Sequence, residues 1–291
     1  KGCWISMVHP DEEEVQRIAQ QTGADFDMLK APLDPEERAR IDAEDNTSLI
    51  LVDIPTIEME GKDFVYSTIP LGILTTENHL ITVCLKDSHI MRDFAQNHVK
   101  GFFTYKKTRF ILQILYRNAS RYLQYLRQID KKTNAIETEL QRTLRNQELM
   151  QLMRLEKSLV FFATSLKSNE IVLEKLLRSD LIRRFPDDED LLEDVIIENK
   201  QAIEMCAIYR DILSSTMDAF SSVISNNVND IMKVLTSLTL VLSIPTLIAS
   251  IWGMNVKVPF EGDSVGFWIL LGASLLASII SIVILSKRRM L

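Results

Sequence analysis

Five hydroxyl side chains recur along an apolar stretch near the C-terminal end of the chain. They follow one another at steps of three, four, three and four residues, and they are Thr236, Thr239, Ser243, Thr246 and Ser250. In an α-helix this spacing places all five on one stripe. Small polar residues favour close packing between membrane helices, but hydroxyl oxygens can also line a water-filled path for an ion. The spacing leaves both interpretations open.

A second group of side chains that could do chemistry is acidic. It consists of six carboxylates that directly follow Pro186, namely Asp187, Asp188, Glu189, Asp190, Glu193 and Asp194. Carboxylate oxygens are ligands that Mg²⁺ prefers, so the cluster could bind a divalent cation. The cluster also lies where a helix is expected to begin, and carboxylates stabilise a helix N-terminus by about 0.3–1 kcal/mol each. Composition alone does not separate the two interpretations.

The hydroxyl stripe lies in the first of two uncharged stretches. No charged residue occurs from 234 to 256 or from 264 to 286. Each stretch is long enough to cross a bilayer core, which takes roughly 20 apolar residues in a helix. The connecting loop is short, so the two helices must run antiparallel. We therefore expect two membrane-spanning helices, with both ends of the chain on the same side.

Basic residues next to the spans predict their orientation. Lys287, Arg288 and Arg289 follow the second span, and Lys233 precedes the first. The loop between the spans contains a single basic residue, Lys257. Basic residues favour the cytoplasmic side, which places both termini in the cytoplasm and the loop outside. Together with the lack of a visible signal peptide, this predicts a multi-pass protein of the cell (plasma) membrane.

The chain before the spans is predicted to combine a mixed α/β region with long helices. A helix is expected over 10–21, with Pro10 near its first position and Gly23 closing it. A turn at Glu77 and Asn78 predicts a hairpin between the last two strands. The expected strands cover 3–8, 48–54, 64–69, 71–75 and 80–85.

Two long helical regions are expected after this α/β region. Apolar residues recur at helical steps after Thr104, which predicts a helical hairpin with its turn near Arg145 and Asn146. After Pro186 neither proline nor glycine occurs before Pro245. A single helix over 187–252 would extend about 100 Å, which is far longer than a usual globular helix.

These expectations describe an α+β membrane protein of seven segments. They are a cytoplasmic α/β domain (1–100), a helical hairpin (101–185), the cytoplasmic part of a stalk helix (186–233), a first transmembrane helix (234–256), an outer loop (257–266), a second transmembrane helix (267–286) and a basic cytoplasmic tail (287–291).

The tripeptide Gly253-Met254-Asn255 closes the first span, which is entered through the sequence Asn-Asp-Ile-Met-Lys-Val-Leu-Thr at 229–236. A Gly-Met-Asn tripeptide at this place, followed by a short loop, a final span and a basic tail, resembles the CorA family of magnesium transporters, part of the metal ion transporter superfamily. The resemblance extends over essentially the whole chain. It implies a homopentameric funnel whose first transmembrane helices line a pore for Mg²⁺.

The resemblance also implies roles for particular residues of that pore. Asn255 would bind hydrated Mg²⁺ at an outer mouth formed by Gly253, Met254 and Asn255, although a helix C-cap is the plain alternative for Asn255. Leu235 would form a hydrophobic constriction. The pore-lining positions would be Asn229, Leu235, Thr236, Thr239, Ser243, Thr246 and Ser250. The family often has methionine where Ser243 stands, and Pro245 is shifted by one position, so gating details do not transfer directly.

Regulation by intracellular Mg²⁺ is a further implication of the resemblance. Asp194 matches an aspartate of an intersubunit Mg²⁺ sensor that holds the family's pore closed. Ala31 stands where the partner acid of the adjacent subunit is expected, and Asp34 or Asp27 could take its place. Bound Mg²⁺ would then shift the population toward a symmetric closed ring.

Other classes of protein fit the sequence less well. An enzyme is not expected, because there is no GxxxxGK[ST] or GxSxG motif and the four histidines lack metalloprotease spacing. No organic cofactor is implied. A net charge of −7 argues against nucleic acid as a partner. The expected partners are the lipid bilayer, divalent cations and further copies of the chain.

Two alternatives remain within the membrane proteins. One is a transporter of zinc or another transition metal, such as Co²⁺ or Ni²⁺, on the same scaffold. Met254 and the absence of soft or imidazole ligands from the stripe disfavour zinc. The other is a membrane-anchored oligomeric scaffold that conducts nothing, which explains the long helices but not the hydroxyl stripe or the outer loop.

Overall fold

The computed structural model describes residues 2–44, 47–60, 63–143, 146–179, 186–255 and 264–288. The chain divides into two compact units, Lys1–Met217 and Asp218–Leu291. Most of the expected outer loop (257–266), the end of the basic tail and Arg145 of the expected hairpin turn lie outside the described residues.

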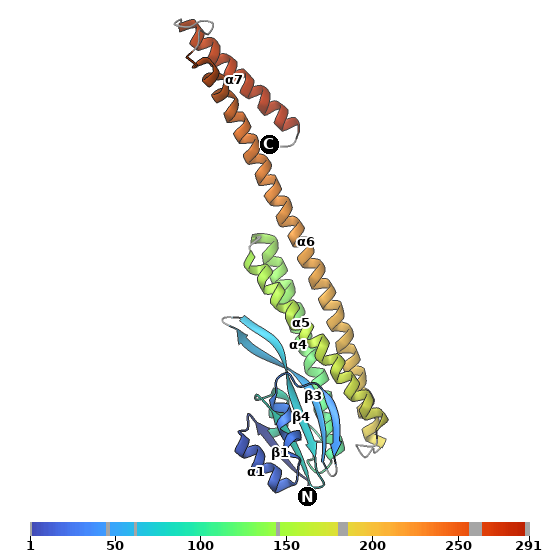
Figure 1. Ribbon diagram of the computed structural model, residues 1–291. Coiled ribbons are helices and arrows are strands. Elements are labelled where there is room, and N and C mark those ends of the chain that lie inside the picture. The colour runs from blue at the N-terminus through green and yellow to red at the C-terminus, as the bar shows by residue number, and fades with distance from the viewer. Residues whose placement is uncertain are drawn as a thin grey trace. The chain divides into compact units, whose positions relative to one another are not determined.

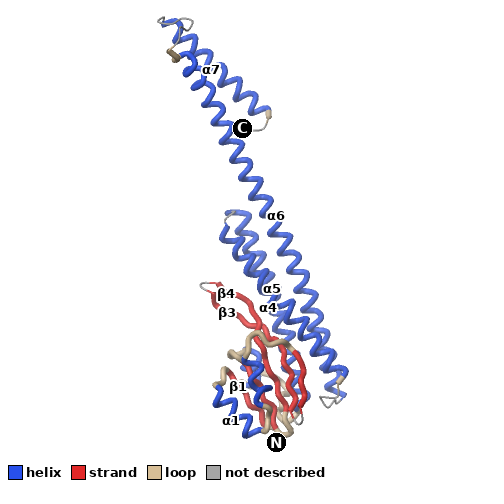
Figure 2. The backbone as a smooth tube through the Cα atoms, in the orientation of Figure 1, coloured by secondary structure: helices blue, strands red, loops and turns tan. Residues whose placement is uncertain are grey.

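The first unit is built around a five-stranded sheet (Figures 1 and 2). Its strands lie in the order β1-β5-β4-β3-β2, with β1 parallel to β5 and the other neighbours antiparallel. The strands are β1 (Cys3–Val8), β2 (Arg40–Glu44), β3 (Thr47–Glu60), β4 (Asp63–Thr75) and β5 (His79–Cys84). The expected hairpin between the last two strands is confirmed.

Two expectations for the sheet were wrong. β2 was not expected, and β4 was divided into two strands at Pro70, whereas Pro70 lies inside a single strand. The ladder between β4 and β5 begins at Leu71, one residue later. Proline cannot donate a ladder hydrogen bond, but at this position none is required of it. The strand therefore continues through Pro70.

Alternate residues of β3 pack on opposite faces of the sheet, as the pleat requires. On one face, Leu49 and Leu51 belong to a hydrophobic cluster with α1 (Glu12–Thr22) and α2 (Phe26–Lys30). On the other face, Ile50 and Val52 belong to a second cluster with four helices. These are α3 (His89–Ala95), α4 (Lys107–Thr143), α5 (Asn146–Arg178) and the start of α6 (Pro186–Trp252). A 3₁₀ helix, Ala31–Leu33, follows α2.

The start of α1 differs from the expectation that placed Pro10 near the first helical position. Asp11 is the N-cap, and its side chain accepts a hydrogen bond from Glu14 N while the Glu14 side chain accepts one from Asp11 N. This reciprocal capping box satisfies two free amides at once and sets the start of the helix. At the other end Gly23 closes the helix with φ 69°, as expected.

Two further helices, each with a long apolar stretch, follow α4 and α5. α6 (Pro186–Trp252) has 67 residues and is unbroken at Pro245, and α7 (Ser264–Lys287) has 24 residues. Both contain a stretch apolar enough to cross a membrane, and only 6% of each stretch is buried. The expected mixed α/β region, long stalk helix and two C-terminal apolar helices are thus all present.

Beyond the end of β2, the side-chain amide of Asn169 forms the hydrogen bonds to β3 that a neighbouring strand would otherwise form. The ladder between β2 and β3 stops at Leu51. Two residues later, Asp53 N donates to Asn169 Oδ1 at 2.9 Å and Asn169 Nδ2 donates to Asp53 O at 2.8 Å. Asn118 and Tyr122 of α4 donate to the same carbonyl at 2.9 and 3.2 Å. Two helices are thereby fixed to one residue of β3.

Replacing Asn169 with alanine should destabilise the first unit by about 2–3 kcal/mol. The Asp53 carbonyl keeps two other donors, but the Asp53 amide loses its acceptor at a half-buried position. Urea unfolding of the detergent-solubilised protein, followed by circular dichroism, measures the change. Asn134→Ala, at an exposed position of α4, is the matched control. Equal stability of the two variants would contradict this role for Asn169.

The side chain of Asp53 is itself unusual, because burial raises the pKa of its carboxyl group from 3.8 to about 6, although a hydrogen bond with Ser165 opposes part of the shift. The folded protein therefore binds a proton more tightly at this group than the unfolded chain does. It follows that stability is greatest at low pH with respect to this group and falls as the pH rises from about 4 through 6.

Asp53→Asn should remove this pH dependence and raise the stability at pH 7 by up to about 3 kcal/mol, because the amide carries no charge to bury. Thermal unfolding of the two proteins at several pH values between 4 and 7 tests this. We expect the melting temperatures to converge toward pH 4, to separate as the pH rises to about 6, and to keep a nearly constant difference above it. Asp211→Asn, at an exposed position of α6, should follow the wild type throughout. A constant offset at every pH would count against the titration of Asp53.

Candidate pore face and metal sites

The hydroxyl stripe lies on the exposed surface of α6 in the second unit, and all five of its side chains are exposed. Thr239, Ser243 and Thr246 donate their hydroxyl hydrogens to backbone carbonyls one turn earlier, at 2.8, 2.7 and 3.0 Å. Their oxygen lone pairs therefore remain as acceptors on the open side of the helix. An exposed row of acceptor oxygens suits a hydrated cation.

A shallow groove of about 430 Å³ runs along this stripe. It is lined only by residues of α6, which are Thr239, Leu242, Ser243, Thr246, Leu247 and Ser250. Thr236 is exposed but does not line this groove. One helix supplies one wall of a channel, so this face can enclose an ion path only together with other copies of the chain.

Other hydroxyl groups of the same unit behave differently. Ser237 of α6 and Ser274 of α7 are buried, as expected where small residues pack between membrane helices. The stripe is thus not the part of α6 that packs within its own unit. The stripe is therefore available to other copies of the chain, either for packing or for lining a path.

The Gly-Met-Asn tripeptide follows the last residue of α6. Gly253 N donates to Ala249 O at 2.9 Å, so the helical hydrogen bonds continue one residue past Trp252. A Cβ atom at Gly253 would lie 3.3 Å from the same carbonyl oxygen, so a larger residue fits tightly there. Met254 and Asn255 are exposed. Within the described part of the chain the Asn255 side chain forms no hydrogen bond.

Two further pore positions suggested by the sequence precede the stripe on α6. Asn229 and Leu235 are both exposed, and the side chain of Leu235 keeps 54% of its surface accessible. An exposed leucine is ordinary where a helix faces lipid or a second copy of the chain. Their placement is compatible with a constriction, which stays a prediction.

The acidic cluster at the start of α6 has two kinds of member. Asp188 is buried and forms an ion pair with Arg109 of α4, with 3.5 Å between Oδ1 and Nη1. Glu189, Asp190, Glu193 and Asp194 are exposed. Asp188 is therefore a structural contact, and the sequence could not separate it from its neighbours. The exposed members remain available to a cation.

The possible head-domain partners of Asp194 are also exposed. Asp27 lies in α2, and Asp34 follows the 3₁₀ helix, where its side chain accepts a hydrogen bond from Glu36 N at 2.9 Å. Among the described residues, no three His, Cys, Asp or Glu side chains come together to hold a metal ion. One chain by itself therefore does not bring these three acids together, and a sensor would have to form between copies.

Comparison with known protein families matches residues 1–288 to the family described as CorA-like Mg²⁺ transporter protein. The chain belongs to this family. It is thus a member of a transporter family with two C-terminal transmembrane helices, and the expectations of a membrane protein that is not an enzyme are confirmed.

Individual CorA relatives support the assignment along the whole chain. The cobalt/magnesium transport protein CorA of Methanocaldococcus jannaschii is 28% identical over 296 residues, covering 98% of this chain and 90% of the relative. The protein of the same name from Thermotoga maritima is 23% identical over 304 residues, covering 99% and 83%. The complete structure of the M. jannaschii CorA magnesium transporter matches with a TM-score of 0.82 at 26% identity, covering 97% of this chain and 89% of that one.

Proposed function

We propose that the chain is a subunit of a homopentameric channel that admits Mg²⁺ through the cell membrane. The observation that carries the proposal is the exposed row of acceptor oxygens along α6, in a chain of the CorA family. The names of the M. jannaschii and T. maritima relatives, both cobalt/magnesium transport proteins, support the choice of ion. The basic residues beside the spans favour cytoplasmic termini.

The proposed driving force is the membrane potential. The sequence contains no phosphate-binding loop of the GxxxxGK[ST] type that would couple transport to hydrolysis. Two positive charges moving inward gain about 4.6 kcal/mol at 100 mV. Passive influx therefore suffices if the pore lowers the cost of removing the ion from bulk water.

Selection at the outer mouth is assigned to Asn255. Mg²⁺ gives up its water reluctantly, so a ring of neutral amide oxygens can hold the hydrated ion through its outer shell. Asn255 is exposed and its side-chain amide forms no hydrogen bond within the described chain, which suits this role. Cyclic symmetry would repeat the amide around the entrance.

Asn255→Ala should abolish most Mg²⁺ uptake, because the methyl group offers no oxygen to the hydrated ion. Proteoliposomes loaded with a Mg²⁺-sensitive dye and held at an inside-negative potential provide the measurement, and we expect the initial rate to fall at least about tenfold. The matched control is Asn227→Ala on α6, which is exposed and lies two residues from Asn229, on a different side of the helix.

Several results of the same assay would redirect the assignment. Equal uptake by wild type and Asn255→Ala would remove Asn255 from the mouth. Saturable Co²⁺ or Ni²⁺ flux without Mg²⁺ flux would favour a transition-metal transporter on this scaffold. No flux of any of these ions through well-folded protein would favour a non-conducting scaffold.

Regulation by intracellular Mg²⁺ is proposed to act through Asp194, with Asp34 or Asp27 of the adjacent subunit as partner. All three carboxylates are exposed, as a site between subunits requires. Facing carboxylates repel each other, so a bound Mg²⁺ would stabilise the closed ring by neutralising them. Loss of the ion would shift the population toward open states.

Asp194→Asn should leave the pore active when internal Mg²⁺ is high, because one carboxylate of the sensor is lost. The measurement is uptake by proteoliposomes preloaded with increasing Mg²⁺ concentrations. We expect inhibition of the variant to need at least about tenfold more internal Mg²⁺. Glu204→Gln, at an exposed position of α6 outside the acidic cluster, is the control. Identical inhibition curves for wild type and Asp194→Asn would rule out this sensor residue.

A further inference from the structure

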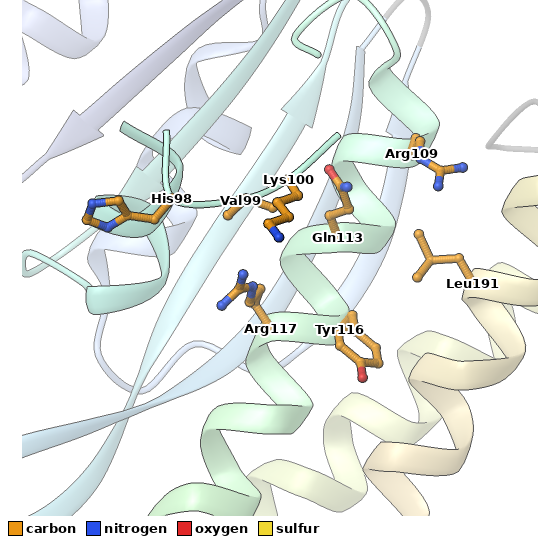
Figure 3. A pocket seen from close by; sticks show the side chains of 8 residues that line it. All are labelled: His98, Val99, Lys100, Arg109, Gln113, Tyr116, Arg117 and Leu191. Atoms are coloured by element: carbon orange, nitrogen blue, oxygen red, sulfur yellow. The ribbon is translucent and has the colours of Figure 1, made fainter. Parts of the chain in front are cut away.

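A basic pocket lies in the first unit between α4, the segment that follows α3 and the start of α6 (Figure 3). Its volume is about 370 Å³, within the roughly 300–1,000 Å³ of small-molecule sites. The lining residues are His98, Val99, Lys100, Arg109, Gln113, Tyr116, Arg117 and Leu191. None of them belongs to the acidic cluster or to the hydroxyl stripe.

Cationic groups outnumber the carboxylates that neutralise them. Arg109 is paired with Asp188 at 3.5 Å, and Arg117 approaches Asp93 at 3.8 Å. Asp93 is shared, because Arg121 contacts the same oxygen at 3.3 Å. Lys100 is exposed and forms no ion pair within the part of the chain that the structure describes. The pocket therefore carries positive charge that an anion would balance.

The side chains are arranged so that one ligand could use both polar and apolar parts of the pocket. In Figure 3 the charged ends of Lys100 and Arg117 point toward each other, while Tyr116 and Leu191 lie on the side of α6. Two like charges facing each other favour an anion between them. The tyrosine ring and the leucine offer an apolar surface beside that charge.

Gln113 adds a polar atom to the lining of this pocket. Its Oε1 atom is buried, and no donor among the described residues reaches it. A buried carbonyl without a donor costs about 1–3 kcal/mol, so a ligand that donates a hydrogen bond to it would gain affinity. An amino group of a heterocyclic base, or a ribose hydroxyl, could donate to it.

We propose that this pocket binds a phosphate-bearing organic anion of the nucleotide class. Lys100 and Arg117 would contact the phosphate groups, Gln113 would form a hydrogen bond with the base or sugar, and Tyr116 with Leu191 would pack against the base. Arginine binds phosphate oxygens through its planar fork of donors. The site requires no hydrolysis and does not depend on the ion that the pore carries.

The place of the pocket suggests what binding would do. Leu191 lies three residues before Asp194 on α6, and Arg109 reaches from α4 to Asp188 at the start of the same helix. A ligand here would contact α4 and the first turns of α6 together. Binding would stabilise that contact within the first unit.

Binding of ATP to the full-length protein in detergent, measured by isothermal titration calorimetry with divalent ions chelated, tests the proposal. Lys100→Gln and Gln113→Glu should each weaken binding at least about tenfold, the first by removing a charged contact to the phosphates and the second by bringing a negative charge into the pocket of an anionic ligand. Lys167→Gln, at an exposed position of α5, should bind like the wild type. Asp194→Asn should also bind normally, which separates this site from the Mg²⁺ sensor.

Three results would overturn the proposal. The first is no ATP binding, or weakening by Lys167→Gln as large as that by Lys100→Gln. The second is pyrophosphate binding as tightly as ATP, since the base and sugar would then contribute nothing. The third is a zero-length carbodiimide cross-link between Lys100 and a second copy of the chain, because a carboxylate of that copy would then occupy the pocket.

Discussion

A backbone that crosses a bilayer must satisfy its own hydrogen bonds, and this constraint governs the second unit. A helix meets it within one segment, and the two uncharged stretches accordingly form the apolar part of α6 and α7. The helix is continuous at Pro245, although proline removes the amide that would donate to the carbonyl of Val241. Three of the five hydroxyls of the stripe donate back to carbonyls of the helix and so add no unsatisfied donor.

In the first unit, backbone groups of a strand also need hydrogen-bond partners where the neighbouring strand ends. β3 continues past its neighbour β2, so the backbone of Asp53 needs partners that no strand provides. Side chains of α4 and α5 supply them, and the amide of Asn169 bonds both backbone groups at once. The same contacts fix the helices to the sheet. Secondary structure and tertiary packing thus depend on one set of hydrogen bonds.

The sequence predicted most elements because long uncharged or proline-free stretches have few alternatives. It missed β2 since Arg40–Glu44 is short and contains three charged residues, with only Ile41 buried. The sequence prediction divided β4 because the chain alone does not show that pairing with β5 begins only at Leu71, which leaves Pro70 without a ladder hydrogen bond to donate. The stripe on α6 was found from its spacing alone. Contacts between distant segments were not accessible, such as Arg109 with Asp188, which are 79 residues apart.

The direction of the hydroxyl bonds in the stripe has a consequence for the sign of the charge that could pass. With their hydrogens committed to carbonyls of the same helix, Thr239, Ser243 and Thr246 turn only lone pairs outward. Chloride approaching these three residues would meet oxygen and no donor from them, whereas the water shell of a cation could donate to all three oxygens. This part of the helix would therefore disfavour anions without any acidic side chain, and so without a fixed charge strong enough to hold a divalent ion tightly.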